Sequence, residues 1–222
     1  MTLQNILESP ELRHTLAALP DDPQLTDLLK AHAAQAARLA VAQARPVDID
    51  ARIAGIDRDL VDADDKARRA LLTERSLLRE ERDTLPVRLC EEGKRTATAE
   101  LAVLGHLTAR IRPFGEAAAR ELGPIESRAN YMHARITTVE SSLLDRASKE
   151  DRTTTYRGEL AEAAPQVRAL NERIRLVEYG LASIRGYVVQ RFGAGVEPQN
   201  PNTYGAAAEA YARRVVRAAG VA

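Results

Sequence analysis

The residue types that most often bind metals or transfer protons are few and scattered in this chain. Its four histidines lie far apart, and none has a second histidine one helical turn away: they are His14, His32, His106 and His133. A helical zinc site needs two such ligands on one face together with further donors. We therefore expect no metal site. His32 falls on the apolar face of a predicted helix, which indicates a packed or hydrogen-bonded histidine.

The other reactive side chains show no arrangement that would support catalysis. Cys90 is followed by Glu91-Glu92, and neighbouring carboxylates disfavour the thiolate that a nucleophilic cysteine needs. The pair Glu80-Glu81 suits the solvated flank of a heptad helix. The stretch from Gly193 to Gly195 lacks the third glycine of a nucleotide-binding loop and follows a predicted helix instead of a strand. We expect a protein that is not an enzyme, with no catalytic residue, no cofactor and no small-molecule substrate.

The charge balance argues against nucleic acid as a partner, and the apolar pattern argues against a membrane. Lysine plus arginine and aspartate plus glutamate both number 32, so the chain lacks the basic surplus of a nucleic-acid-binding protein. The start of the chain has no charged leader followed by an apolar stretch, and no apolar run approaches the roughly 18 residues needed to cross a bilayer. A single cysteine permits no internal disulfide, which favours a reducing compartment. We expect a cytoplasmic protein, or one assembled into a particle from the cytoplasm, that binds neither nucleic acid nor membrane.

Scarce aromatic residues and abundant helix formers favour an all-α fold. The 222 residues include no Trp, two Phe and six Tyr. Ala, Leu, Arg and Glu dominate, and all four have high helix propensity. Without large rings to fill a thick core, the apolar material suits close packing of helix on helix. The alanine and arginine bias also indicates a bacterial or bacteriophage origin.

Two helix starts are expected near the N-terminus. Ser9-Pro10 and Asp22-Pro23 each place a capping residue ahead of a proline at the first helical position. The second helix is predicted to reach about residue 44, and its alanine-rich part, 31–44, would let a partner helix approach closely. Proline disfavours the helical conformation in the residue before it, so Arg45-Pro46 predicts a break or a kink.

A long apolar stripe predicts one helix over 48–112. Its apolar residues recur at intervals typical of a heptad pattern and are flanked by dense charge, as in coiled-coil-like packing. Pro86 is expected to kink this helix without ending it, because the stripe resumes at once. The prolines and glycines of 113–124 predict a turn. The stripe consists of Ile49, Ile53, Ile56, Leu60, Ala63, Ala67, Leu71, Leu78, Leu85, Leu89, Ala97, Leu101, Leu104 and Ile111.

The segment 125–192 carries two further stripes separated by a polar stretch. The first runs from Ile125 to Leu143 and the second from Leu160 to Val188, and their phases differ by about one residue. This slip of phase favours a hairpin whose tip lies near 148–155. One continuous helix with a solvated middle is the alternative, and the pattern leaves both open. The side chains expected in the core are Leu78, Ile136, Leu170, Ile174 and Leu181.

The C-terminal region predicts a linker and a short helix. Phe192-Gly193 is typical of a helix end with a glycine cap, the linker covers 193–205, and the last helix spans about 205–219. Tyrosine is favoured at the centres of interfaces, so we expect this flexibly joined helix to contact a partner. In the alternative, it folds back and caps its own bundle. The candidate partner-binding residues are Tyr204, Tyr211, Arg213, Arg214 and Arg217.

These patterns together predict an all-α fold: an elongated antiparallel coiled coil or helical bundle of long heptad-patterned helices with short N- and C-terminal helices. The expected parts are an N-terminal helical segment (1–46), a long coiled-coil body (47–192), and a linker with a short C-terminal helix (193–222).

The functional expectation follows from the amount of apolar surface, which exceeds what one hairpin can cover. We expect self-association, a complex with another protein, or both. This favours a non-enzymatic structural or interaction protein, such as a scaffold, spacer or assembly component. The alternative is a regulatory binder, an adaptor or inhibitor that occludes a protein or nucleic-acid surface.

The heptad pattern makes a spectroscopic prediction. The far-UV circular dichroism spectrum of the purified chain should show well over half helix, and its small-angle scattering profile should be elongated. A spherical profile would contradict the coiled-coil interpretation, because such long stripes exceed what a compact domain needs.

Overall fold

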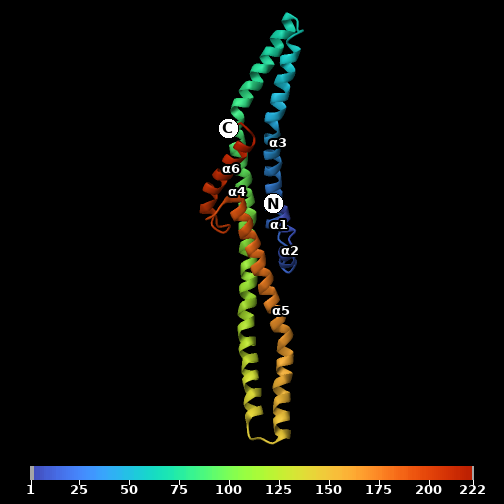
Figure 1. Cartoon of the computed structure of the whole chain (residues 1–222), viewed down its shortest axis with the longest axis vertical. Helices are drawn as coiled ribbons and strands as arrows, with labels where there is room; N and C mark the ends of the chain where they lie inside the picture. The colour runs from blue at the N-terminus through green and yellow to red at the C-terminus, as the bar shows by residue number, and fades with distance from the viewer. Residues whose placement is uncertain (1–2, 222) are drawn as a thin grey trace. The chain divides into compact units, whose positions relative to one another are not determined.

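The computed structural model describes residues 3–221, apart from the side chain of Glu11, and over this range it contains helices and no strand (Figure 1). Helices make up 88% of the described residues, which confirms the predicted all-α class. In chain order the elements are α1 (Leu3–Leu7), α2 (Pro10–Ala17), α3 (Pro23–Asp59), α4 (Asp65–Ser141), α5 (Arg146–Phe192), the 3₁₀ turn η1 (Pro201–Thr203) and α6 (Tyr204–Ala218).

The helices form two compact units that are discontinuous along the chain. Unit 1 contains residues 1–20 and 108–184, and unit 2 contains 21–107 and 185–222. The long helices α4 and α5 therefore each contribute to both units. The predicted boundary between 46 and 47 falls inside α3, whereas the predicted boundary at 192/193 coincides with the end of α5.

In unit 2, α3 and α4 pack antiparallel, and heptad-spaced ion pairs set their register. On one flank, Arg45 of α3 binds Glu81 of α4 through two hydrogen bonds of 2.7 and 2.8 Å, and Arg52 binds Glu74 through bonds of 2.7 and 2.9 Å. Each residue of the second pair lies seven positions from its counterpart in the first, in opposite directions along the two helices. This is the spacing at which flanking charges join neighbouring helices of a coiled coil.

The opposite flank of the same helix pair carries ion pairs of reversed polarity. Asp50 of α3 lies 2.8 Å from Arg82 of α4, and Asp57 lies 3.0 Å from Arg75. Between the two rows of ion pairs, the apolar side chains that α3 buries include Ile49 and Ile56. An apolar seam between two charged flanks confirms the predicted heptad arrangement of this segment.

The turn between α3 and α4 lies where the sequence predicted continuous helix. The predicted helix over 48–112 is wrong, because α3 ends at Asp59 and α4 begins at Asp65. Asp64 caps the new helix, since its Oδ1 accepts hydrogen bonds from the backbone N–H groups of Lys66 and Ala67 at 3.1 and 2.8 Å. The local signal was this aspartate, which the apolar stripe through Ala63 and Ala67 obscured.

Conversely, two predicted interruptions lie within helices. α3 continues through Arg45-Pro46, and Pro46 is buried on its packed face. α4 continues through 113–124, where the sequence predicted a turn. In unit 1, a Cβ placed on Gly115 would lie 2.7 Å from Cγ1 of Val177 on α5, so this glycine permits close helix approach instead of a turn.

The segment 125–192 is a hairpin, as the phase slip favoured. Its tip is Ser142–Asp145, which precedes the predicted 148–155. Asp145 caps α5 by accepting hydrogen bonds from the N–H and the hydroxyl of Ser148 at 3.0 and 2.7 Å. The polar stretch that suggested a tip lies in the first turns of α5, where the Thr154 hydroxyl bonds to the carbonyl of Glu150 at 2.7 Å.

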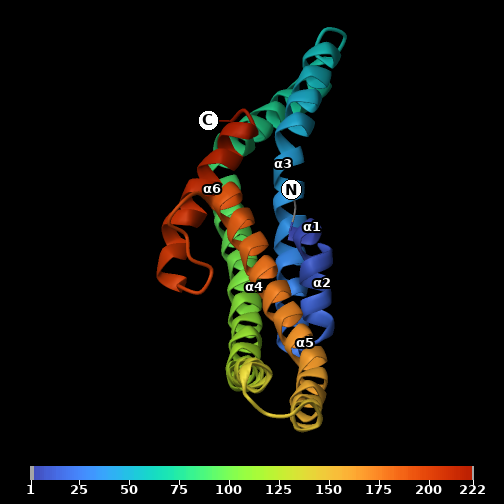
Figure 2. The same ribbon diagram turned by 60° about the horizontal axis from the view of Figure 1, so that its bottom comes forward.

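Unit 1 also contains the short N-terminal helix α2, which lies beside α5 (Figure 2). A Cβ on Gly180 of α5 would lie 3.5 Å from Cδ1 of Leu12, an ordinary contact distance. Leu12 is fully buried. The predicted start of this helix at Ser9-Pro10 is confirmed, although the Ser9 side chain makes no capping hydrogen bond.

The side chains expected in the core are half-buried instead of buried. Where two helices pair without further cover, each side chain of the seam contacts one neighbouring helix and keeps one edge in water. Full burial occurs where more helices meet, as at Leu89, Leu101 and Leu104 of α4. The half-buried residues are Leu78, Ile136, Leu170, Ile174 and Leu181.

The position of the hairpin tip predicts how unit 1 responds to insertions. One alanine inserted between Leu143 and Leu144 should leave the melting temperature almost unchanged, because exposed loop tips tolerate insertion. One alanine inserted between Arg168 and Ala169 should rotate the two parts of the α5 seam by about 100° and destabilise the fold by about 2–5 kcal/mol through lost burial. Equal melting temperatures for the two variants, measured by circular dichroism, would contradict this tip.

Candidate functional site

The most enclosed part of unit 2 is the α4 segment from Thr96 to Leu107. Leu101, Val103, Leu104 and Leu107 are each fully buried, although they point to different sides of the helix. A helix buried on all sides lies at the centre of a bundle. Within unit 2, α3, α5 and α6 all contact this segment or the turns just before it.

A single carboxylate, that of Glu100, lies inside this enclosed segment. Its side chain is 1% exposed, and Oε1 accepts a hydrogen bond from the hydroxyl of Tyr187 on α5. Nε of Arg191, one turn further along α5, lies 3.4 Å from the same oxygen. From α3, Nε2 of His32 lies 3.8 Å from Oε2, which is too far for a direct hydrogen bond. Three helices therefore converge on one buried charge.

These partners keep the carboxylate ionised. Burial by itself raises the pKa of Glu100, but the interactions with His32, Tyr187 and Arg191 outweigh it and hold that pKa below its usual value. Burial and the hydrogen bond to Glu100 raise the pKa of the Tyr187 hydroxyl far above its usual range, so this hydroxyl remains a donor. The buried cluster thus contains an anion, a neutral phenol and a guanidinium.

Arg191 extends the cluster to α6. Its NH2 group donates a hydrogen bond of 2.9 Å to the hydroxyl of Tyr211, and its Cζ lies 4.7 Å from the centre of that ring. Its backbone carbonyl accepts a hydrogen bond from the guanidinium of Arg214. Phe192 packs against Tyr211 with the ring centres 5.9 Å apart. The end of α5 therefore joins the Glu100 carboxylate to the C-terminal helix.

A second polar contact in unit 2 anchors the start of α3. Nε2 of His106 lies 2.5 Å from Oδ2 of Asp22, the residue before Pro23. The sequence predicted Asp22 as a helix cap; α3 does begin at Pro23, but the carboxylate contacts His106 and makes no capping hydrogen bond. Asp22 therefore joins the start of α3 to α4 instead of capping the helix.

The chemistry open to the Glu100 cluster is limited by its packing. Glu100 and Tyr187 are both almost fully buried, and each already has the other as a hydrogen-bond partner. General acid–base catalysis needs the reacting atom of a substrate within hydrogen-bond reach of such a group. The contacts of this cluster favour a structural role, in which opposite charges and hydrogen bonds hold four helices together.

The predicted partner-binding residues lie on α6, which docks on its own chain (Figure 2). The Tyr204 hydroxyl lies 3.0 Å from the Leu101 carbonyl and 2.5 Å from the Pro198 carbonyl. Tyr211 contacts Arg191, as described above. Arg213 lies 3.8 Å from Glu209 on its own helix, and Arg217 is exposed. These intramolecular contacts therefore agree with the alternative in which the helix caps its own bundle. Contact between this helix and a partner stays a prediction.

Sequence reasoning missed Glu100, Tyr187 and Arg191. Leu101 occupies the stripe position between Ala97 and Leu104, and Glu100 stands beside it, where a heptad pattern normally places a solvated charge, so no local feature indicated a buried partner. The identity of that partner was not readable, since Tyr187 lies 87 residues away in the chain. The histidine on the predicted apolar face, His32, does lie against the cluster.

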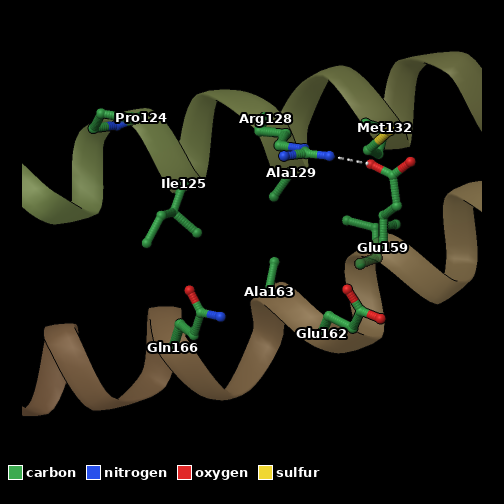
Figure 3. A pocket seen from close by; sticks show the side chains of 10 residues that line it. Pro124, Ile125, Arg128, Ala129, Met132, Glu159, Glu162, Ala163 and Gln166 are labelled. Carbon is green, nitrogen blue, oxygen red and sulfur yellow. Dashed lines mark hydrogen bonds and ion pairs between the residues drawn. The ribbon is translucent and has the colours of Figure 1, made fainter.

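Unit 1 contains an open groove between α4 and α5, with a volume of about 290 Å³ (Figure 3). Ala129 and Ala163 face each other across it, and these short side chains leave the space between the helices unfilled. An ion pair of 2.8 Å between Arg128 and Glu159 crosses one end. The groove is lined by two carboxylates, those of Glu159 and Glu162, of which Glu159 pairs with Arg128, and by no histidine or cysteine; its lining suggests a gap in packing.

In comparisons with known proteins, no model of a protein family, no curated protein and no solved structure matches the chain. Within residues 3–221, no group of three or more His, Cys, Asp or Glu side chains is placed to hold a metal ion. Over the same range, no helix combines the length and apolar character needed to cross a membrane.

The lowered pKa of Glu100 makes a testable pH prediction. Replacing Glu100 with Gln should lower the free energy of unfolding at neutral pH by about 1–3 kcal/mol, because Tyr187 loses a charged acceptor and Arg191 loses its ion pair. A carboxyl whose pKa is lower in the folded than in the unfolded chain stabilises the fold above its unfolded pKa and loses this effect as pH falls through the folded pKa.

The difference between the wild type and Glu100→Gln should therefore shrink as pH falls below about 4. Urea unfolding at several pH values measures it. Glu80→Gln, at an exposed position of α4, is the matched control and should change stability little at any of these values. A difference for Glu100→Gln that is independent of pH would contradict the ionised state assigned to Glu100.

Proposed function

We propose that this chain is a non-enzymatic structural protein, an assembly component whose copies associate through the outer face of α3. The observation that carries the proposal is a second heptad pattern on α3, separate from the one that packs inside unit 2. We call it the outer stripe. It consists of Ala33, Ala37, Ala40, Ala44, Val47, Ala51 and Ala54, all exposed.

The outer stripe repeats at intervals of four and three over the same part of α3 that buries Leu39, Ala42, Pro46 and Ile49 on its inner face. A helix with one face in a bundle normally presents charged residues to water on the other. α4 follows this rule, with exposed Arg79, Glu80 and Asp83. α3 departs from it, and a/d spacing of apolar residues is what a partner helix requires.

Alanine alone would be a weak argument, because alanine also suits solvated helices through its high propensity. The valines strengthen it. Val41, beside the stripe, and Val47, within it, are 68% and 71% exposed. Short alanine side chains between them would let a second helix approach closely, and that approach would cover both valines.

The proposal is tested by placing charge on the outer stripe. Ala40→Glu combined with Ala44→Glu should reduce the associated wild type to a monomer in light scattering, because the like charges of two copies would meet within the interface. The melting temperature of the monomeric fold should stay nearly constant, since both positions are exposed.

Ala67→Glu combined with Ala70→Glu is the matched control, because it makes the same two changes at exposed positions of α4 outside the stripe. This variant should associate as the wild type does. A wild type that stays monomeric over the whole concentration range, or two variants that behave alike, would overturn the proposal.

A further inference from the structure

The C-terminal helix α6 docks on unit 2 through a small and specific surface. The residues that α6 buries are three alanines and one valine: Ala207, Ala208, Ala212 and Val215. The surface beneath includes Leu39 and Ala42 of α3 and Leu89 and Gly93 of α4, which we call the α6-docking surface. Tyr211, Val216, Ala219 and Val221 also pack against this surface and are half-buried. A terminal helix attached through one linker can open locally before the rest of the fold.

The docking surface is shaped for the sequence of α6. A Cβ on Gly93 would lie 3.1 Å from Cα and 3.3 Å from Cβ of Ala212, so at this point both helices need a very small residue. Lys94, next to Gly93, pairs with Glu209 at 3.3 Å. On the other side, Arg191 binds Tyr211. A helix that replaces α6 must therefore reproduce its alanine, its glutamate and its tyrosine at the same spacing.

The linker before α6 favours exchange. Residues 193–203 contain two glycines and two prolines and join α5 to α6, and Gly193 and Gly195 have φ values of +103° and +85° that glycine adopts readily. Rotation at these positions redirects the following helix without disturbing α5. Exchange of an identical element between copies through such a hinge is a low-cost route to a dimer.

We propose that the α6-docking surface of one copy also takes α6 of a second copy, exchanged reciprocally through the linker 193–203. A free α6 of 15 residues has too few helical hydrogen bonds to be stable by itself, so a released α6 needs another docking surface to remain helical. The second copy carries the one surface already matched to it. This inference rests on the proposed function only in that both describe association between copies of this chain. It adds a second contact site, the α6-docking surface, to the outer stripe.

The experiment uses complementation between two full-length variants, each of which cannot dock α6 on itself. Gly93→Val blocks the docking surface and leaves α6 intact. Ala212→Glu places a charge on the buried face of α6, so that this helix cannot dock, and leaves the docking surface intact. Both chains also carry Ala40→Glu and Ala44→Glu, so that association through the outer stripe is removed and the two proposals can fail separately. Mixed in equal amounts, they should form a one-to-one heterodimer with twice the monomer mass in light scattering.

Two controls make the result specific. A chain with both Gly93→Val and Ala212→Glu offers neither element, and its mixture with the Gly93→Val chain should stay monomeric. Gly55→Val, where an added Cβ would meet no atom within 4 Å, tests whether valine in a helix by itself alters the mass. A complementing mixture that contains monomers alone would overturn the exchange of α6.

A second variant tests the exchange of α6 if Gly93→Val loses the helical signal in circular dichroism, that is, if this variant does not fold. Deleting residues 193–203 keeps the native α6 and the residues of the docking surface but joins α5 directly to α6, which leaves no turn through which α6 could fold back onto its own copy. With Ala40→Glu and Ala44→Glu also present to remove the outer-stripe contact, this chain should be a dimer, and adding Ala212→Glu to it should give a monomer. A monomeric deletion chain with undiminished helix would overturn the proposal.

Discussion

Unit 2 depends on the satisfaction of one buried charge. A carboxylate removed from water is strongly unfavourable unless opposite charge and hydrogen bonds surround it. Glu100 meets this condition when α5 brings Tyr187 and Arg191, and α3 brings His32, to the same side of α4. Any arrangement that moves α5 or α3 removes one or more of these partners from the charge. The cluster therefore selects one packing of the bundle, whatever its net contribution to stability.

The same charge couples the C-terminal helix to the centre of the unit. Arg191 is held at one end by Glu100, and at the other end it binds Tyr211. Docking of α6 thus fixes the guanidinium that neutralises the buried carboxylate. The polar link between Tyr211 and Arg191 therefore helps to determine where α6 docks, since the side chains that α6 fully buries are small.

Away from this centre, flanking charges determine the register of α3 and α4. The pairs Arg45–Glu81 and Arg52–Glu74 are partly exposed to solvent, so each contributes little stability. They act mainly by making other alignments of α3 and α4 unfavourable. If α4 slipped by one heptad in one direction, Arg45 would face Arg88 and Glu74 would lose its partner. Register is thus specified by the repulsion and the lost pairs of wrong alignments.

Close approach explains several residues that looked like interruptions. Gly93 and Gly115 both lie within α4, where a glycine weakens the helix. Each lies so close to a neighbouring helix that an added Cβ would crowd it, Ala212 of α6 in one case and Val177 of α5 in the other. Gly193, by contrast, ends α5 with positive φ. The same residue type serves two purposes, and the neighbouring chain decides which.

The sequence by itself determined the helical class, the start of α3 at Asp22-Pro23, the end of α5 at Gly193, and the hairpin in 125–192. These features depend on propensity, capping and periodicity, which act over a few neighbouring residues. Tertiary structure alone decided that helix continues through Pro46 and 113–124, that Glu100 meets Tyr187, and that α6 lies on its own chain. These outcomes depend on which helix faces meet across many tens of residues. Such packing can outweigh a local preference worth about 1–3 kcal/mol, and no local pattern records it.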